Sequence, residues 1–283
     1  MDLRPSPIAG QWYSGHAPSL ARSVDGYLDA AKAGVRAPAG KIVGVIAPHA
    51  GHKYSGPVAA YAFEAVRGLE VETVTILCPS HFHDDGLLIT SGHEAYTTPL
   101  GAVAVDREAA AGLRAELAVT LSLPGDLALA AIRHDREHAI EIELPFLQRV
   151  LPEGFQLIPV MLRDQSPRTA RALGLALAKV LRGRRALIVG SSDLSHYYPQ
   201  LIAEELDAEM LKQIDAFDPD GVLAAEAEGR GLACGHGAIA ATLWAARELG
   251  ANHAHVLKHA TSGDVSGDYA QVVGYGAAVI WKE

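Results

Sequence analysis

The sequence IVGVIAPHAGHKYSG, residues 42–56, joins an apolar run to a segment rich in histidine and glycine. Residues 42–47 are mostly β-branched, which is typical of a strand that is buried on both faces of a sheet. Pro48 ends the run and His49 follows directly. Imidazole is costly to leave unpaired in a dry interior, and it is the commonest metal ligand and proton carrier. This stretch therefore predicts a buried strand that carries a histidine to a chemically active site.

Strand and helix patterns alternate along the whole chain. Strands are expected at residues 42–47, 73–78, 87–90, 155–162, 186–190, 255–260 and 272–281. Helices are expected at residues 19–33, 57–67, 107–118, 137–151, 167–181, 199–217 and 236–249. Such alternation predicts an α/β fold with a central mixed, mostly parallel sheet flanked by helices. Because glycine and proline are spread evenly and no linker stands out, we expect a single domain over residues 1–283.

The composition is that of a folded protein, since 49% of its 283 residues are hydrophobic and 20% are charged. A formal net charge of -9 disfavours nucleic acid and anionic membranes as partners, because both are bound chiefly by clustered Lys and Arg. The nearest cluster, Arg182, Arg184 and Arg185, is expected in a solvated turn between a helix and a strand. The sequence indicates neither a membrane-spanning segment nor a disulfide framework, so a cytoplasmic location is expected.

Three of the predicted strands are each followed by a histidine within a few residues. His49 follows the strand at 42–47, His81 follows the strand at 73–78, and His196 follows the strand at 186–190. In open α/β sheets, ligands bind in the crevice outside the carboxyl ends of the strands. We therefore expect these imidazoles to share one polar site.

Cys234 adds a sulfur donor to the predicted site. It lies in the segment LACGHGAIA, just before a predicted helix whose positive end is expected to lower the pKa of the thiol. The neighbouring Gly235 allows a close approach of the backbone, whereas Cys78 inside its strand is expected to be a packing residue. Two histidines and a cysteine can hold a divalent metal and leave positions open for substrate or oxygen. We therefore predict His49, His81 and Cys234 as metal ligands.

An acid/base group is predicted beside these ligands. His196 is preceded by Asp193, and a nearby carboxylate can orient an imidazole and keep its pKa near neutrality. His138 and Glu141 are expected to face the same pocket or to hydrogen-bond the ligands from behind. The catalytic residues are therefore predicted as His196, Asp193 and His138. The sequence assigns no role to the other candidates, His52, His83, His93 and His236.

The segment from His134 to His138 also matches H-x-x-E-H, the inverted zinc-protease signature. On a helix the two histidines would share one face and could bind zinc, with Glu137 as general base. Pro145 lies within the helix predicted at 137–151 and argues against a long, regular metal-bearing segment. Zinc-dependent hydrolysis therefore stays an alternative interpretation of this region.

Six motifs resemble, in order, those of the Memo family (mediator of cell motility). They are PHAGHKYSGPVAA, CPSHF, EHAIEIELPFL, SSDLSHY, CGHGAI and TSGDVSGDYAQVVGYGA, which run from about residue 43 to the C-terminus. The resemblance implies a single-domain α/β fold related to class III extradiol dioxygenases, with a metal site at the edge of the sheet. It also implies metal ligands at His49, His81 and Cys234, with Asp193 and His196 lining the pocket. An AMMECR-type protein and a radical-SAM enzyme, as in the AmmeMemoRadiSam system, are the partners that the resemblance implies.

The third ligand distinguishes this chain from the dioxygenases that it resembles. Those enzymes use two histidines and a carboxylate on Fe(II), whereas Cys234 offers a softer thiolate that suits copper, zinc or a differently tuned iron. We expect a redox-active site with Fe(II) or Cu, or else Zn, that oxidises a small aromatic substrate with O2 while His196 moves the proton. The alternatives are a non-enzymatic module that binds a peptide or protein in the same pocket, and a hydrolase with Cys234 as nucleophile or with zinc.

Overall fold

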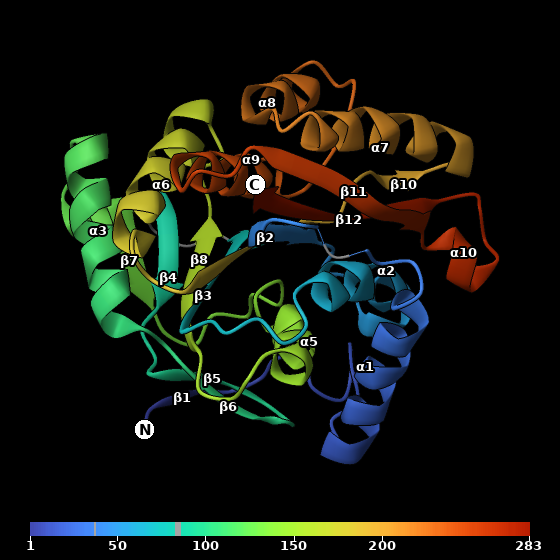
Figure 1. Ribbon diagram of the computed structural model, residues 1–283, viewed down its shortest axis with the longest axis horizontal. Coiled ribbons are helices and arrows are strands. Elements are labelled where there is room, and N and C mark those ends of the chain that lie inside the picture. Colours follow the sequence, from blue (N-terminus) through green and yellow to red (C-terminus); the bar gives the residue numbers. More distant parts are fainter. Residues whose placement is uncertain (37, 83–85) are drawn as a thin grey trace.

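A computed structural model describes residues 1–36, 38–82 and 86–283, and in this part of the chain the largest element is a nine-stranded mixed sheet (Figure 1). Four neighbouring strands in its centre run parallel, in the spatial order β2, β9, β3, β8. Their bounds are Lys41–Ala47, Ala186–Ser191, Thr73–Pro79 and Gln156–Leu162. The predicted α/β fold with a mixed sheet is thus confirmed.

Antiparallel strands extend the sheet at both ends. β12 (Val272–Lys282) pairs antiparallel with β2, and it also pairs with β10 (His196–Tyr198) and β11 (His253–Thr261). On the other side β4 (Leu88–Ser91) pairs antiparallel with β8 and parallel with β7 (Leu129–Ile132). A separate three-stranded sheet consists of β1 (Leu3–Arg4), β5 (Ala95–Thr98) and β6 (Gly101–Ala104).

Helices cover both faces of the large sheet (Figure 1). One apolar core lies beneath α3 (Arg107–Leu121), α6 (Pro167–Leu181), α7 (Gln200–Asp215), α8 (Pro219–Ala227) and α9 (His236–Glu248). The other lies beneath α1 (Ala17–Ala31), α2 (His52–Ala65) and α5 (Leu144–Val150). The remaining helical segments are short: α4 (Gly125–Ala128), η1 (Glu141–Glu143) and α10 (Gly263–Ser266).

Side chains of the central strands alternate between these two cores. In β9, Leu187 and Val189 join the core beneath α1 and α2, while Ile188 between them joins the core beneath α6 and α9. Successive side chains of a strand point to opposite faces, so a strand covered on both sides must be apolar at every position. This explains why the parallel strands read as continuous apolar runs rather than as alternating ones.

Two predicted helices differ from those observed. The helix predicted at 57–67 begins earlier, at His52, and Pro57 lies inside it. The helix predicted at 137–151 is replaced by a non-helical loop, the turn η1 and the short helix α5. Pro145 lies in the first turn of α5, where its missing N–H is not needed. The loop stays non-helical because the carboxylate of Glu137 accepts hydrogen bonds from the backbone N–H groups of His138 and Ala139.

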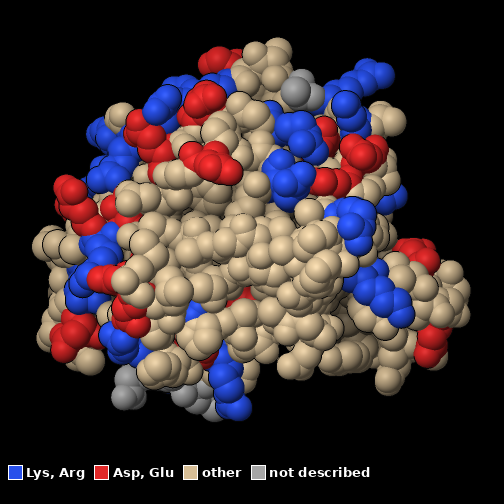
Figure 2. All heavy atoms as spheres, turned by 90° about the horizontal axis from the view of Figure 1, so that it is seen from below, with Lys and Arg blue, Asp and Glu red and all other residues tan. Residues whose placement is uncertain are grey.

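The surface carries charges of both signs. On the face in Figure 2, Lys and Arg lie among Asp and Glu around a broad band of uncharged residues. In the part of the chain that the structure describes, no helix is long and apolar enough to cross a membrane.

Candidate metal centre

Three neighbouring strands deliver the candidate site to one edge of the large sheet. β9 lies between β2 and β3 and is parallel to both, and Ala47 at the end of β2 is in register with Ser191 at the end of β9. His49, Asp193 and His81 each follow the last residue of their strand by two positions. Because the strands are parallel and adjacent, their carboxyl ends place these three residues side by side.

The three predicted metal ligands meet at this edge. One ring nitrogen from each of His49 and His81 and Sγ of Cys234 all lie within 4.8 Å of one another. Nε2 of His49 is 3.2 Å from Sγ of Cys234, and the His49 and His81 rings are 5.3 Å apart and nearly perpendicular. The structure thus brings together two imidazoles and a thiol from three separate parts of the sequence.

A hydrogen-bond chain fixes the tautomer of His49. Its Nδ1 lies 2.9 Å from Oγ of Ser191, and that hydroxyl donates to Oε1 of Glu143 at 2.6 Å. The same hydroxyl lies 3.1 Å from the carbonyl oxygen of Ala139, which can only accept. The single hydroxyl hydrogen of Ser191 is therefore directed away from His49, so Nδ1 of His49 is the donor in the first bond and the lone pair stays on Nε2. The buried ring of His49 therefore presents a metal-binding atom to Cys234.

His81 is held in the same way by Glu137. Its Nδ1 lies 3.0 and 3.1 Å from the two oxygens of that carboxylate, and its backbone N–H donates to Glu137 at 2.7 Å. Histidines that bind metals usually donate their second ring N–H to a carboxylate or carbonyl, which fixes the ring and raises its basicity. Nε2 of His81 is thereby left as the donor atom for a metal.

A second cluster shares one member with the first. His81, Glu137 and His138 also lie close enough to hold an ion. Glu137, however, already accepts hydrogen bonds from His81 and from the backbone N–H groups of His138 and Ala139. Burial raises the pKa of Glu137, but the hydrogen bonds from His81 and the charges of His81 and His138 outweigh it and lower the pKa to about 2. Glu137 is thus a buried anion that positions His81.

The histidines of the site differ in basicity. Burial, reinforced by the neighbouring imidazoles of His138 and His81, holds the pKa of His49 well below its usual value. Burial also lowers the pKa of His138, to about 4, despite the charge of Glu137. For His81, burial lowers the pKa, but the hydrogen bond and charge of Glu137 outweigh it, so the pKa is raised. At neutral pH, His49 is therefore a neutral base, as metal binding requires, whereas a metal ion at His81 competes with a proton that Glu137 favours.

The surroundings of Cys234 differ from the prediction. Burial, followed by the negative charge of Asp193, raises the pKa of its thiol above the usual value, so the predicted lowering by the helix terminus is wrong. A bound cation would offset this, because thiolate formation is driven by a coordinating metal ion. Gly235 does permit a close approach, to the backbone of β9: an added Cβ would lie 2.8 Å from the carbonyl oxygen of Ser191.

Asp193 and His196 lie in the pocket but are not paired with each other. Oδ1 of Asp193 accepts hydrogen bonds from the backbone N–H groups of His49 and Ala50 at 2.8 and 3.2 Å. Nδ1 of His196 instead donates to the carbonyl oxygen of Leu194 at 2.8 Å. The prediction that Asp193 orients His196 is therefore wrong, because a backbone carbonyl does so. Burial raises the pKa of Asp193 to about 7 and lowers that of His196.

Glu141 does not reach the pocket. Its buried carboxylate accepts a hydrogen bond from Arg4 at 3.0 Å and further bonds from the hydroxyls of Ser6 and Tyr13. It therefore anchors the N-terminal segment, and the prediction that it lines the site or supports the ligands is wrong. His134 has a left-handed backbone conformation and lies outside any helix, so the helical zinc-protease arrangement is also wrong.

A pocket of about 580 Å³ opens beside two of the predicted ligands, His49 and His81. His49, His81, His138, Asp193 and His196 all contribute to its lining. The sequence did not predict the contribution of the N-terminal segment, from which Trp12 lies 4.2 Å from the ring of His138. Trp12, Tyr54 and Tyr197 are partly or largely exposed at the pocket and give it an aromatic wall.

The comparisons with known proteins give the family. A family model described as Memo-like protein matches residues 4–279. The chain belongs to the Memo family. A MEMO1 family protein of Nitrosopumilus maritimus is 39% identical over 236 residues, which cover 83% of each chain. One of Methanopyrus kandleri is 40% identical over 239 residues, 83% of this chain and 82% of the relative. One of Methanothermobacter thermautotrophicus is 37% identical over 280 residues, 96% of this chain and 98% of the relative.

The Memo motifs quoted above carry the residues that support the ligands as well as the ligands themselves. Ser191 opens SSDLSHY, while Glu137 and Glu143 lie in EHAIEIELPFL. The bonds of Ser191 to His49, of Glu137 to His81 and of Glu143 to Ser191 were not predicted, because they join segments far apart in the sequence. The only available signal was that these polar residues occur within otherwise apolar stretches that also contain site residues.

The described histidines to which the sequence assigned no role make hydrogen bonds outside the proposed metal site in this Memo protein. His52 is buried and bonds through Nε2 to the carbonyl oxygen of Ile142 at 2.9 Å. His93 bonds to Asp2, and Nδ1 of His236 lies 3.1 Å from the carbonyl oxygen of Ala233. His83 lies outside the described residues.

Proposed function

We propose that this protein binds one metal ion through His49, His81 and Cys234, and that the ion is a redox-active iron or copper. The observation that carries the proposal is the pairing of both Nδ1 atoms. Ser191 and Glu137 each occupy the Nδ1 side of one histidine, and both Nε2 atoms are left for a cation beside Sγ. This donor set fits a divalent or cuprous ion, and the thiolate favours copper, iron or zinc over magnesium or calcium.

The pocket supports a small aromatic substrate. Trp12, Tyr54 and Tyr197 provide aromatic faces for a flat ring, and a volume of about 580 Å³ is in the range of small-molecule sites. A bound iron or copper would supply electron transfer and a binding position for O2. The reaction that we propose is the O2-dependent oxidation of such a substrate.

His196 is the proposed proton carrier. Its Nδ1–H is held by the carbonyl of Leu194, so Nε2 is the atom that can accept a proton from a phenolic hydroxyl. Burial lowers the pKa of His196, which keeps the ring neutral and able to accept a proton at pH 7. Asp193 holds the backbone of His49 in place.

Oxygen uptake tests the proposed reaction. Protein loaded anaerobically with Fe(II) or Cu(I) is mixed with a panel of phenols and catechols, and O2 consumption is followed with an electrode. We expect uptake with at least one phenol, and a loss of about 10²-fold or more in rate for His196→Gln at unchanged metal content. Loaded protein that consumes no more O2 than the free metal with every member of the panel would refute the reaction, though not the metal site.

A non-enzymatic binding module is the second candidate, and the exposed aromatic wall favours it. Trp12 and Tyr197 are 37% and 69% exposed, and aromatic side chains are frequent anchors in peptide recognition. In that case a peptide selected for binding to this pocket would still bind to the variants His49→Ala and Cys234→Ala. It would not bind to the variant Trp12→Ala. Co-purification with an AMMECR-type protein or a radical-SAM enzyme, which we propose as partners on family grounds, would be tested with the same variants.

Hydrolysis with Cys234 as nucleophile is disfavoured by the charges of the site. Nε2 of His49 lies 3.2 Å from the sulfur, but burial lowers the pKa of His49 and raises that of Cys234. Both shifts oppose the thiolate–imidazolium pair on which cysteine nucleophiles depend. Coordination to a cation would reverse the shift of Cys234 and suits the neutral ring of His49, which is why we favour the metal.

A further inference from the structure

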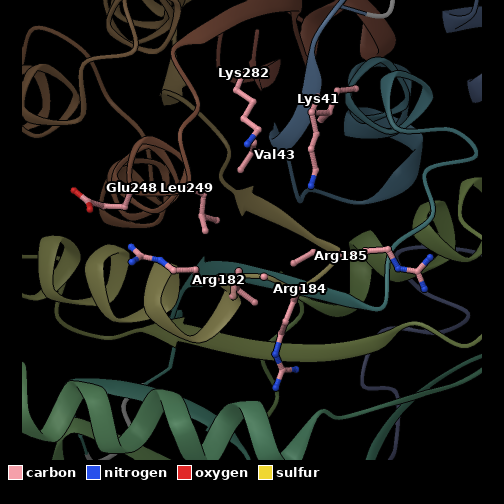
Figure 3. Close-up of a pocket in the computed structure, with 12 residues that line it drawn as sticks. Lys41, Val43, Arg182, Arg184, Arg185, Glu248, Leu249 and Lys282 are labelled. Atoms are coloured by element: carbon pink, nitrogen blue, oxygen red, sulfur yellow. The ribbon is translucent and has the colours of Figure 1, made fainter.

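A second cavity lies at the opposite end of the parallel strands. It has a volume of about 400 Å³ and is lined by the first residues of β2 and β9, the last residues of β12, and the ends of α6 and α9. Figure 3 shows the side chains around it. None of the proposed metal-site residues is among the residues that line it.

The lining is strongly basic. Lys41, Arg182, Arg184, Arg185 and Lys282 line the cavity, against one carboxylate, Glu248. The whole chain carries 24 Lys and Arg against 33 Asp and Glu, so this pocket has the opposite sign to the protein. The predicted turn between a helix and a strand at residues 182–185 is confirmed, and its arginines form one wall of the cavity.

Two of the five cations are neutralised by carboxylates outside the cavity. Arg184 pairs with Asp106 at 2.8 Å, and Arg185 pairs with Glu72 at 2.7 Å. In Figure 3 both guanidinium groups extend away from the two lysines. Among the residues that the structure describes, Lys41, Arg182 and Lys282 make no salt bridge.

The two lysines are direct neighbours across the sheet. Lys282 of β12 is the register partner of Lys41 of β2, and in Figure 3 both side chains extend in the same direction into the cavity. Like charges on directly opposed residues destabilise an antiparallel pair. The two chain segments also approach each other closely here, since a Cβ on the adjacent Gly40 would lie only 2.0 Å from the carbonyl oxygen of Lys282.

The helix ends account for only part of this charge. The carboxyl termini of α6 and α9 carry partial negative charge and favour nearby cations, which explains Arg182, the C-cap residue of α6. Lys41 begins a strand and gains nothing comparable from its own backbone. A multiply charged anion between the two lysines would instead remove their repulsion and provide a partner for the charge of Arg182.

We propose that this cavity binds the phosphate group of a small phosphorylated molecule or free diphosphate, held between Lys41 and Lys282 with Arg182 at its margin. Lysine binds phosphate as a point charge with three donors, and arginine adds a planar fork. A cavity of about 400 Å³ accommodates a diphosphate with part of an attached organic group. The site is independent of the proposed metal site, since it lies at the other end of the strands and shares no lining residue with it.

Calorimetric titration with inorganic pyrophosphate at constant low ionic strength tests the proposal. We expect saturable binding to the full-length protein, weakened at least tenfold in the double variant Lys41→Gln/Lys282→Gln. Lys32→Gln, an exposed lysine at the end of α1, is the matched control and should bind as the wild type does. Circular dichroism and melting curves establish that each variant is folded, and Lys41→Gln alone serves if the double variant is not.

A comparison of two ligands identifies the source of the phosphate, and the control variant gives the result that would overturn the proposal. Tighter binding of ADP than of pyrophosphate would assign the site to a phosphorylated organic molecule, and the reverse order would assign it to free diphosphate. Equal weakening in Lys32→Gln, or binding by the wild type no tighter than by the folded lysine variants, would show a nonspecific charge effect and refute the site.

Discussion

The two ends of the parallel strands carry opposite chemistry. At the carboxyl ends, His49 is buried, is held in one tautomer by Ser191 and lies beside the half-buried thiol of Cys234. At the amino ends, the cationic side chains of Lys41 and Lys282 belong to residues that pair directly across β2 and β12. The first end offers lone pairs to a cation, and the second offers N–H donors and positive charge to an anion.

The difference follows from how each end is made. Residues that follow parallel strands converge on one crevice, so single side chains from β2, β3 and the loop before α9 can meet there. Residues that precede the strands meet the carboxyl ends of α6 and α9, where cations are favoured. The buried carboxyl ends therefore favour neutral metal-binding side chains with a defined tautomer. The open amino ends favour charged side chains that remain solvated.

The largest expected effect is the loss of metal from the carboxyl end in Cys234→Ala. Removing one of three ligands should lower metal affinity by more than about 100-fold, since loss of a supporting residue alone typically costs about 10- to 100-fold. Competition titration with a chromogenic chelator measures the affinity. Cys78→Ala removes the other thiol, which is buried inside β3, and should keep wild-type affinity. Equal affinities in both variants would exclude Cys234 as a ligand.

A smaller effect is expected from Glu137→Gln. The amide keeps the shape of the side chain but removes the charge that positions His81, so metal affinity should fall by about 10- to 100-fold. Glu141→Gln changes a carboxylate in the same segment that binds Arg4 instead, and it should leave the affinity of the folded protein unchanged. If both variants lose metal equally, the effect comes from the segment as a whole.

His52 is a buried histidine near the carboxyl ends of the strands that is not a proposed metal ligand, so a variant at this position tests the effect of burial without an effect on metal binding. Burial lowers its pKa to about 4, below the unfolded value of about 6.5. Between these values the unfolded chain binds the extra proton, so stability falls as the pH falls from about 6.5 towards 4. His52→Gln should remove about 2 kcal/mol of the stability difference between pH 7 and pH 5, while metal affinity is kept. Urea unfolding at both pH values measures this, and an unchanged pH difference would contradict it.

The smallest expected effect is at the amino end. Lys41→Gln should stabilise the protein by about 0.2 to 1 kcal/mol at low ionic strength, because it removes a like-charge pair across β2 and β12. The gain should shrink in 0.5 M salt, since exposed charges are screened. Thermal unfolding at two salt concentrations checks this. A loss of stability at low salt would mean that the lysines do not repel each other.

The sequence was sufficient for the sheet and for the convergence of the site, because both depend on local patterns. A continuous apolar run followed by proline and histidine predicts a buried strand with a histidine at its carboxyl end. Parallel strands then bring His49 and His81 together without further information. Short strands such as β1, β5 and β6 were missed because segments of two to four residues carry no usable periodicity.

The supporting interactions could not be read from the sequence, because they join distant segments. Glu137 reaches His81 from 56 residues away, and Arg4 reaches Glu141 from 137 residues away. The pKa of Cys234 was predicted from the helix that follows it, yet burial by tertiary packing determines its direction. Local dipoles are visible in a sequence, but the loss of solvent around a side chain is not.

X-ray absorption at the metal edge of protein loaded with a single equivalent of zinc tests the central claim most directly. His49, His81 and Cys234 predict one sulfur neighbour at about 2.3 Å and two imidazole nitrogens at about 2.0 to 2.1 Å, and loss of the sulfur in Cys234→Ala. A coordination shell of nitrogen and oxygen alone in the wild type, unchanged in Cys234→Ala, would contradict the three-ligand site.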